Sequence, residues 1–125
     1  MKKIKSTRAP EAIGPYSQAI KDDSYVFTSG QIGISPETGE IVSDNFELQV
    51  IQAFKNLDFI LIESGSSLSK VIKLNIYLID LNNFQQLNDL LLTILNTDFL
   101  PARATVEVSR LPKDAKIEID AIAGL

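Results

Sequence analysis

Two charged residues in the last quarter of the chain, Arg103 and Glu118, are of types that bind and act on a small acid. A guanidinium holds a carboxylate through two parallel hydrogen bonds, and a glutamate beside it could hold a water molecule or move a proton. Polar and apolar residues alternate in both segments, 103–109 and 116–122, as in strands. If the two strands pair as a hairpin with their apolar sides together, Arg103 and Glu118 fall on the same polar side. A plain cross-strand ion pair on a solvated face would give the same pattern.

The chain contains neither histidine nor cysteine. This excludes Ser–His triads, imidazole acid–base catalysis, thiolate nucleophiles, disulfides and thiolate zinc sites. Any chemistry must therefore use Asp, Glu, Tyr, Ser, Lys, Arg, backbone groups or bound water. Hydrolysis of a bond that is already reactive suits this set better than acyl transfer through an activated serine.

Composition is that of one soluble globular domain covering residues 1–125, with 45% apolar and 22% charged residues. The net charge of -4 argues against binding to nucleic acid or to an anionic membrane surface. The basic stretch 1–5 is not followed by the apolar segment of a secretory signal, and no apolar run approaches a membrane span. We therefore expect a cytoplasmic protein.

Two further segments carry groups that could line a pocket. The loop 9–19 contains two prolines and a glycine, which should hold Tyr16 in one place, either as a pocket wall or as part of a packed connector. Ser29 and Gly30 end a strand, where the missing side chain of glycine would let a ligand approach, although such a pair is often only a strand end.

The periodicity predicts an α+β fold of about six strands with two helices on one face of the sheet. The expected strands are 2–5, 18–21, 25–29, 71–79, 103–109 and 116–122. The first helix should begin near 43–45, with Asp44 and Glu47 forming a capping box, and should end at Gly65. The second should run from Phe84 to about Asn96.

Strand 71–79 predicts that the sheet has a second, covered face. Ile72 and Leu74 begin its apolar side, while Tyr77 and Ile79 make the other side only half polar. No further helix is available to cover that side, so the pattern alone predicts a homo-oligomer. In the second helix the run 90–95 is apolar nearly all round and should be buried or touch another chain. Asn88 precedes it, either as an ordinary surface or satisfied residue or as a ligand contact.

Matching residues in nearly every segment make the chain resemble the Rid (YjgF) family of enamine/imine deaminases. The matches are at 9–10, 13–19, 28–32, Asn88, 101–103, 106–108 and 111–123. They occur in the family's order and spacing. Arg103, after Pro101 and Ala102, stands where the deaminase-competent members have their arginine.

The resemblance implies a homotrimer of chorismate-mutase-like subunits with ligand sites between chains. It also implies hydrolysis of 2-imino acids, such as 2-iminobutanoate and 2-iminopropanoate, to 2-keto acids and ammonia, without metal or cofactor. In that comparison Arg103 binds the substrate carboxylate and Glu118 activates water. Ser29 and Gly30 would line the floor of the site, Tyr16 its wall, and Asn88 would approach from the second helix.

Departures from the family pattern concern the breadth of the pocket more than the chemistry. Asp120 stands where close relatives often have glutamate, and the run 90–95 lacks the usual aromatic residues. A non-catalytic carboxylate-binding, regulatory or chaperone-like module using the same cleft is the main alternative. An RNA-cleaving protein is disfavoured by the acidic composition and the absence of histidine.

Overall fold

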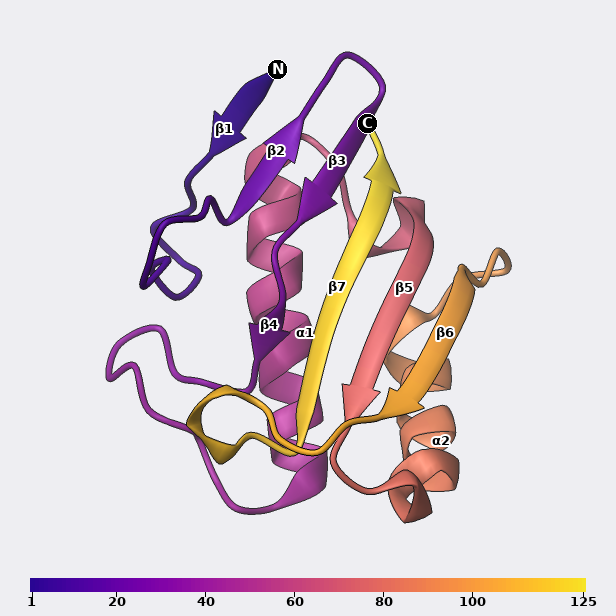
Figure 1. Ribbon diagram of the computed structural model, residues 1–125. Coiled ribbons are helices and arrows are strands. Elements are labelled where there is room, and N and C mark those ends of the chain that lie inside the picture. Colours follow the sequence, from indigo (N-terminus) through magenta and orange to yellow (C-terminus); the bar gives the residue numbers. More distant parts are fainter.

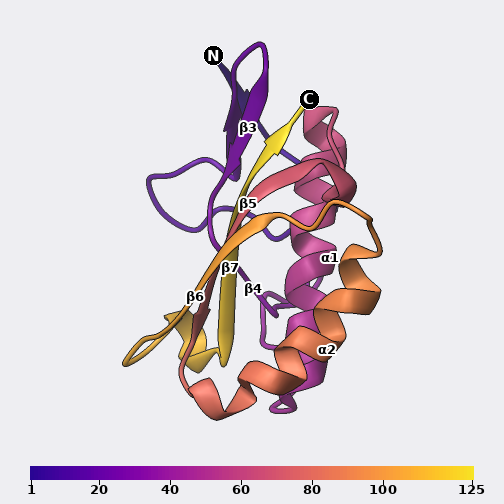
Figure 2. The same cartoon turned by 90° about the vertical axis from the view of Figure 1, so that its right-hand side faces the viewer.

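The computed structural model describes all 125 residues as one mixed sheet with two α-helices on one of its faces (Figures 1 and 2). The strands are β1 (Lys2–Ile4), β2 (Ala19–Lys21), β3 (Tyr25–Thr28), β4 (Gln31–Ile32), β5 (Val71–Leu78), β6 (Ala102–Glu107) and β7 (Ile117–Gly124). The helices are α1 (Phe46–Ser64) and α2 (Phe84–Leu95), with short 3₁₀ turns at Leu68–Lys70, Leu81–Asn83 and Pro112–Asp114. The predicted α+β class and the placement of both helices are confirmed.

The strand order is β1-β2-β3-β7-β5-β6, and β4 pairs with β7 beside β3. Every pairing is antiparallel except that of β5 with β6, which are parallel and joined through α2. The predicted hairpin between the last two strands is therefore wrong, because β5 lies between them. A parallel β–α–β crossover needs a connecting helix, and α2 supplies it.

Helix α1 ends at the predicted glycine, and it begins at a cap one residue later than expected. Asn45, not Asp44, is the N-cap, and its side chain accepts a 3.0 Å hydrogen bond from the amide of Leu48. Gly65 ends the helix in the left-handed conformation with φ of 87°, which glycine adopts without steric cost.

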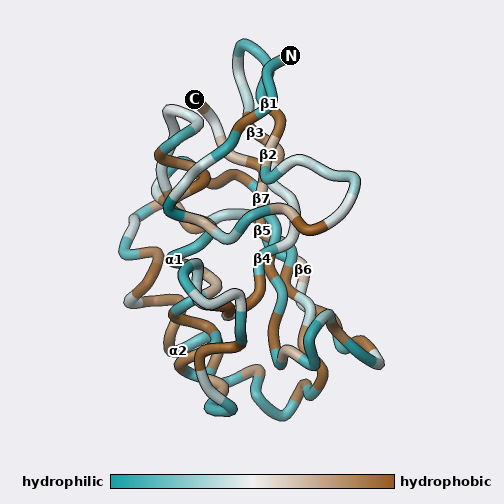
Figure 3. Tube along the Cα trace, turned by 90° about the vertical axis from the view of Figure 1, so that its left-hand side faces the viewer, coloured by the Kyte–Doolittle hydropathy of each residue, from teal (hydrophilic) through white to brown (hydrophobic).

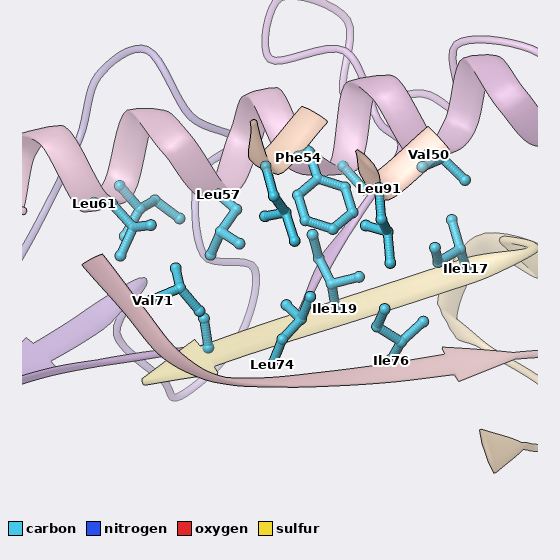
Figure 4. Packing of buried hydrophobic residues seen from close by; sticks show 14 of the residues in the cluster. Val50, Phe54, Leu57, Leu61, Val71, Leu74, Ile76, Leu91, Ile117 and Ile119 are labelled. Atoms are coloured by element: carbon cyan, nitrogen blue, oxygen red, sulfur yellow. The ribbon is translucent and has the colours of Figure 1, made fainter. Parts of the chain in front are cut away.

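The core lies between α1 and the sheet (Figure 4). Val50, Leu57 and Leu61 project from α1 toward Leu74 of β5 and Ile119 of β7, and all are fully buried. From α2, Leu91 joins this cluster. Large-to-alanine changes at such positions typically cost about 2–5 kcal/mol.

A β-bulge changes the predicted alternation at the start of β5. The pairing with β7 shifts between Val71 and Lys73, so Val71 is buried and Ile72 is 48% exposed. The prediction that Ile72 belongs to the core side is wrong, because the extra residue of a bulge reverses the sides of those before it. From Leu74 onward the predicted alternation holds.

The face of the sheet opposite the helices is uncovered in the single chain (Figure 2). Tyr25 and Phe27 of β3 and Val106 of β6 are each between 44% and 46% exposed there. Hydrophobic and hydrophilic stretches alternate at short intervals along the chain (Figure 3). No helix is both long and apolar enough to pass through a membrane.

Candidate active site

Arg103 lies on the edge strand β6 and faces α2. It is opposite Leu74 in the parallel pairing with β5, which places it on the helix side of the sheet. One guanidinium nitrogen, Nη1, donates a 2.7 Å hydrogen bond to Oδ1 of Asn88, and the guanidinium carbon is 5.2 Å from the ring centre of Phe84. No carboxylate forms an ion pair with Arg103. Two neutral groups therefore orient a cation whose other N–H groups remain free for an anion.

Glu118 lies on the opposite, open face of the same sheet. It is opposite Tyr77 of β5, and Tyr77 is three residues from Leu74, so the side chains point to different faces. The prediction that Arg103 and Glu118 share a polar side is wrong. Its premise, a hairpin with apolar sides together, fails because Val106 lies on the open face while Ile117 and Ile119 face the helices.

Gly30 packs directly against the Glu118 carboxyl group. A Cβ atom at position 30 would lie 2.8 Å from Cδ and 3.0 Å from Oε2 of Glu118, closer than real contacts allow. Burial raises the pKa of Glu118, and the negative charge of Asp120 raises it further. Asp120 itself accepts a 2.8 Å hydrogen bond from the Asn75 amide. Glu118 is thus a carboxyl group with an increased tendency to hold a proton.

Ser29 joins the loop carrying Tyr16 to the end of β3. Its hydroxyl donates a 2.5 Å hydrogen bond to the Ser17 carbonyl, and its amide donates to the carbonyl of Gln18. Tyr16 is 53% exposed, and its hydroxyl accepts a 3.3 Å hydrogen bond from the Ile13 amide. Tyr16 and Gln31, the residue after Gly30, line one small hollow of about 100 Å³.

A larger cleft of about 340 Å³ opens between α2 and the start of β6, next to Arg103. It is lined by Leu74, Gln85, Asn88, Asp89, Leu91, Leu92, Leu95, Leu100, Pro101 and Arg103. Half of these ten residues are leucines, and the polar ones are Gln85, Asn88 and Asp89 of α2 and Arg103 of β6. A cation at one end of an apolar cleft suits a small organic acid.

The predicted residues therefore form two separate groups. The Arg103 group consists of Arg103, Asn88 and Phe84, and the Glu118 group consists of Glu118, Gly30, Ser29 and Tyr16. Sequence reasoning missed Phe84, which stands four residues before Asn88 and so on the same helix face.

It also missed Thr105 and Gln18. Thr105 shares the side of β6 with Arg103, and its buried hydroxyl has no partner within the chain. Gln18 is buried and donates to the Ser6 and Pro10 carbonyls, which holds the loop before Tyr16. The alternation along 103–109 could have indicated that Thr105 lies on the same side as Arg103. Nothing in the sequence around Gln18 indicates that this residue holds the loop.

Comparison with known proteins agrees with this fold along its whole length. The family model described as "Endoribonuclease L-PSP" matches residues 6–125. YyfA from Yersinia pestis, a solved protein of the Rid family, is 44% identical, with a TM-score of 0.96 over 99% of this chain and 98% of that one. The chain belongs to the Rid family.

Two other members carry information about ligands in their names. Escherichia coli TdcF, solved with bound serine, is 40% identical and has a TM-score of 0.93 over 100% of this chain and 99% of TdcF. The mouse protein named 2-iminobutanoate/2-iminopropanoate deaminase is 41% identical over 122 residues, 98% of this chain and 90% of the mouse protein.

Proposed function

We propose that this Rid protein is a deaminase that hydrolyses 2-imino acids to 2-keto acids and ammonia, acting on 2-iminobutanoate and 2-iminopropanoate. The observation that carries the proposal is the unpaired Arg103 guanidinium at the end of an apolar cleft. The name of the mouse relative supports the reaction, and the serine in TdcF supports a ligand with an α-carboxylate.

Arg103 would bind the substrate carboxylate through two parallel N–H···O bonds. Its contact with the Asn88 oxygen uses only part of its donor capacity and fixes the plane of the guanidinium. Lysine would lack this planar pair of donors. Binding at the carboxylate places the neighbouring imine carbon at a defined distance, and such positioning supplies much of the rate when the bond is already electrophilic.

Glu118 would take a proton from the attacking water. The water oxygen bonds to the imine carbon, and the proton held by Glu118 passes to the nitrogen of the resulting carbinolamine. The hydroxyl proton of the carbinolamine then moves to the nitrogen as the C–N bond breaks, so that ammonia leaves and the carbonyl forms. The raised pKa of Glu118 favours this exchange, since a carboxyl that both accepts and returns a proton works best with a pKa near the operating pH.

The complete site would require a second copy of the chain, because one chain directs Arg103 and Glu118 to opposite faces of its sheet. We propose a homotrimer in which the Arg103 group of one subunit meets the Glu118 group of its neighbour. The exposed side chains of Tyr25, Phe27 and Val106 support burial of the open face against other subunits. The sites would then lie at the subunit boundaries.

A non-catalytic carboxylate-binding role is the second candidate. It is favoured by the fact that the Arg103 group and its cleft form an anion site without any help from Glu118. Such a protein would bind 2-ketobutyrate but would not shorten the lifetime of an imine.

The experiment that separates the two generates 2-iminobutanoate in solution and traps the surviving imine with semicarbazide. The deaminase should lower the yield of trapped imine in proportion to its concentration, and Arg103→Ala should lose nearly all of this effect. Trapping that is unchanged by the wild-type protein would leave only the binding role.

A further inference from the structure

The cleft beside Arg103 is more apolar than carboxylate binding requires. Its floor is formed by the buried side chains of Leu74, Leu91 and Leu95. Its rim carries Leu92 and Leu100, which are 66% and 58% exposed. These surfaces would gain from contact with an apolar group that enters the cleft.

The two walls come from neighbouring parts of the chain. Helix α2 ends at Leu95, and Asn96 follows in the left-handed conformation with φ of 38°. The chain then turns back and brings Leu100 and Pro101 against the helix before β6 begins. Because β6 carries Arg103 two residues after Pro101, the guanidinium and the wall formed by Leu100 and Pro101 belong to one short segment.

We propose that this cleft is the subsite for the substrate side chain, and that it selects 2-imino acids with branched or extended aliphatic side chains, such as the imine of leucine. This inference rests on the proposed function, in which Arg103 holds the carboxylate at the end of the cleft. Its volume of about 340 Å³ is far larger than a methyl or ethyl group needs and is within the usual size of small-molecule sites.

The polar side of the cleft adds a second element of selectivity. Asp89 lines the cleft, and its Oδ1 accepts a 3.1 Å hydrogen bond from the Gln85 amide. A carboxylate at this position repels a substrate that carries a second carboxylate in its side chain. Imines derived from aspartate and glutamate should therefore be poor substrates.

The expected preference follows from the aliphatic area that the cleft can bury. Each methylene group transferred from water improves binding by about fourfold. We expect kcat/KM for the leucine-derived imine to exceed that for the alanine-derived imine by on the order of tenfold or more.

The test compares both imines, generated by an amino-acid oxidase with catalase present, using the full-length protein. The variant Leu92→Gln/Leu100→Gln makes the two exposed rim positions polar. The matched control, Thr93→Gln/Phe99→Gln, changes the adjacent residues, which are exposed and do not line the cleft. The rim variant should lose most of the preference for the leucine-derived imine, and the control should keep it.

The outcomes separate this inference from the deaminase proposal. Turnover of both imines without a preference, or with a preference that the rim variant retains, overturns the subsite and leaves the deaminase standing. If neither imine is turned over, the deaminase proposal fails. Calorimetry then tests the subsite by measuring the binding of keto acids. Tighter binding of 4-methyl-2-oxopentanoate than of pyruvate, reduced in the rim variant, supports it, while equal or absent binding overturns it.

Discussion

Arg103 and Glu118 project from opposite faces of one sheet, separated by β5, which pairs with both of their strands. The two residues expected to perform the chemistry thus cannot meet within one subunit. Each lies in its own prepared setting, Arg103 against Asn88 and Phe84, and Glu118 against Gly30. The proposed activity is consequently tied to assembly, and both parts can be tested separately.

Replacing Arg103 by lysine should be nearly as damaging as replacing it by alanine. Lysine keeps the charge but loses the planar pair of donors. The loss of a charged, hydrogen-bonded contact to the substrate should cost about 2–5 kcal/mol of binding. Steady-state kinetics on 2-iminobutanoate generated in solution measures this. Near-normal kcat/KM in Arg103→Lys would show that a point charge is sufficient.

Gly30→Ala should lower kcat by displacing Glu118. The added methyl group would lie 2.8 Å from the glutamate Cδ, and we expect the side chain to move because Gly30 immediately precedes β4, which pairs with β7. Gly124→Ala is the control, since a Cβ there has no neighbour closer than 3.9 Å. The fold of both variants can be checked by circular dichroism. Equal activity of the two variants would remove Glu118 from the mechanism.

The pH dependence of activity should change when Asp120 is replaced by asparagine. Glu118 must be ionised to accept a proton, so kcat/KM should fall as the pH falls through its pKa. Burial raises that pKa, and the charge of Asp120 raises it further. Asp120→Asn removes only the second cause, so the acid limb should move to lower pH. If the acid limb does not move, the group whose ionisation causes it is not Glu118.

Glu118→Gln should stabilise the fold at neutral pH. Because the pKa of Glu118 is higher in the folded than in the unfolded chain, its contribution favours folding at pH values below the unfolded pKa and is lost as the pH rises through the folded pKa. The variant should have a higher Tm than the wild type at pH 7, and the difference should shrink in acid. A difference that grows in acid would contradict the raised pKa.

A charge on the open face should break the proposed trimer. Phe27→Glu would place a carboxylate among the exposed apolar groups of that face, while Leu48→Glu makes the same kind of change at a 50% exposed position on α1. Light scattering should give about three times 13.8 kDa for the wild type and the Leu48 control, and the mass of one copy for Phe27→Glu. A monomeric wild type would refute the assembly.

The sequence predicted local structure well where one physical signal was decisive. The helical spacing from Phe46 to Leu61 identified the buried side of α1, and Gly65 identified its end. The sequence placed the cap within 43–45 but favoured Asp44 over Asn45, because all three residues are good cap residues and only the backbone geometry selects among them.

Long-range pairing was harder to predict from the residues alone. The short connection between β6 and β7 suggested a hairpin, but the β5–α2–β6 crossover places β5 between the two strands. Neither that insertion nor the bulge at Val71 leaves a local mark in the sequence. Residue type and pattern pointed to the six candidate residues and the family resemblance gave them their roles, whereas their division into two groups required the topology.

Mixing two inactive variants tests the central claim most directly. Chains carrying Arg103→Ala and chains carrying Glu118→Gln would be co-expressed with different tags, and assemblies containing both would be purified. If the site joins Arg103 of one subunit to Glu118 of its neighbour, every mixed trimer has one site with both residues intact, and activity should return to roughly a third of the wild-type level. A mixture as inactive as either parent would contradict a site shared between subunits.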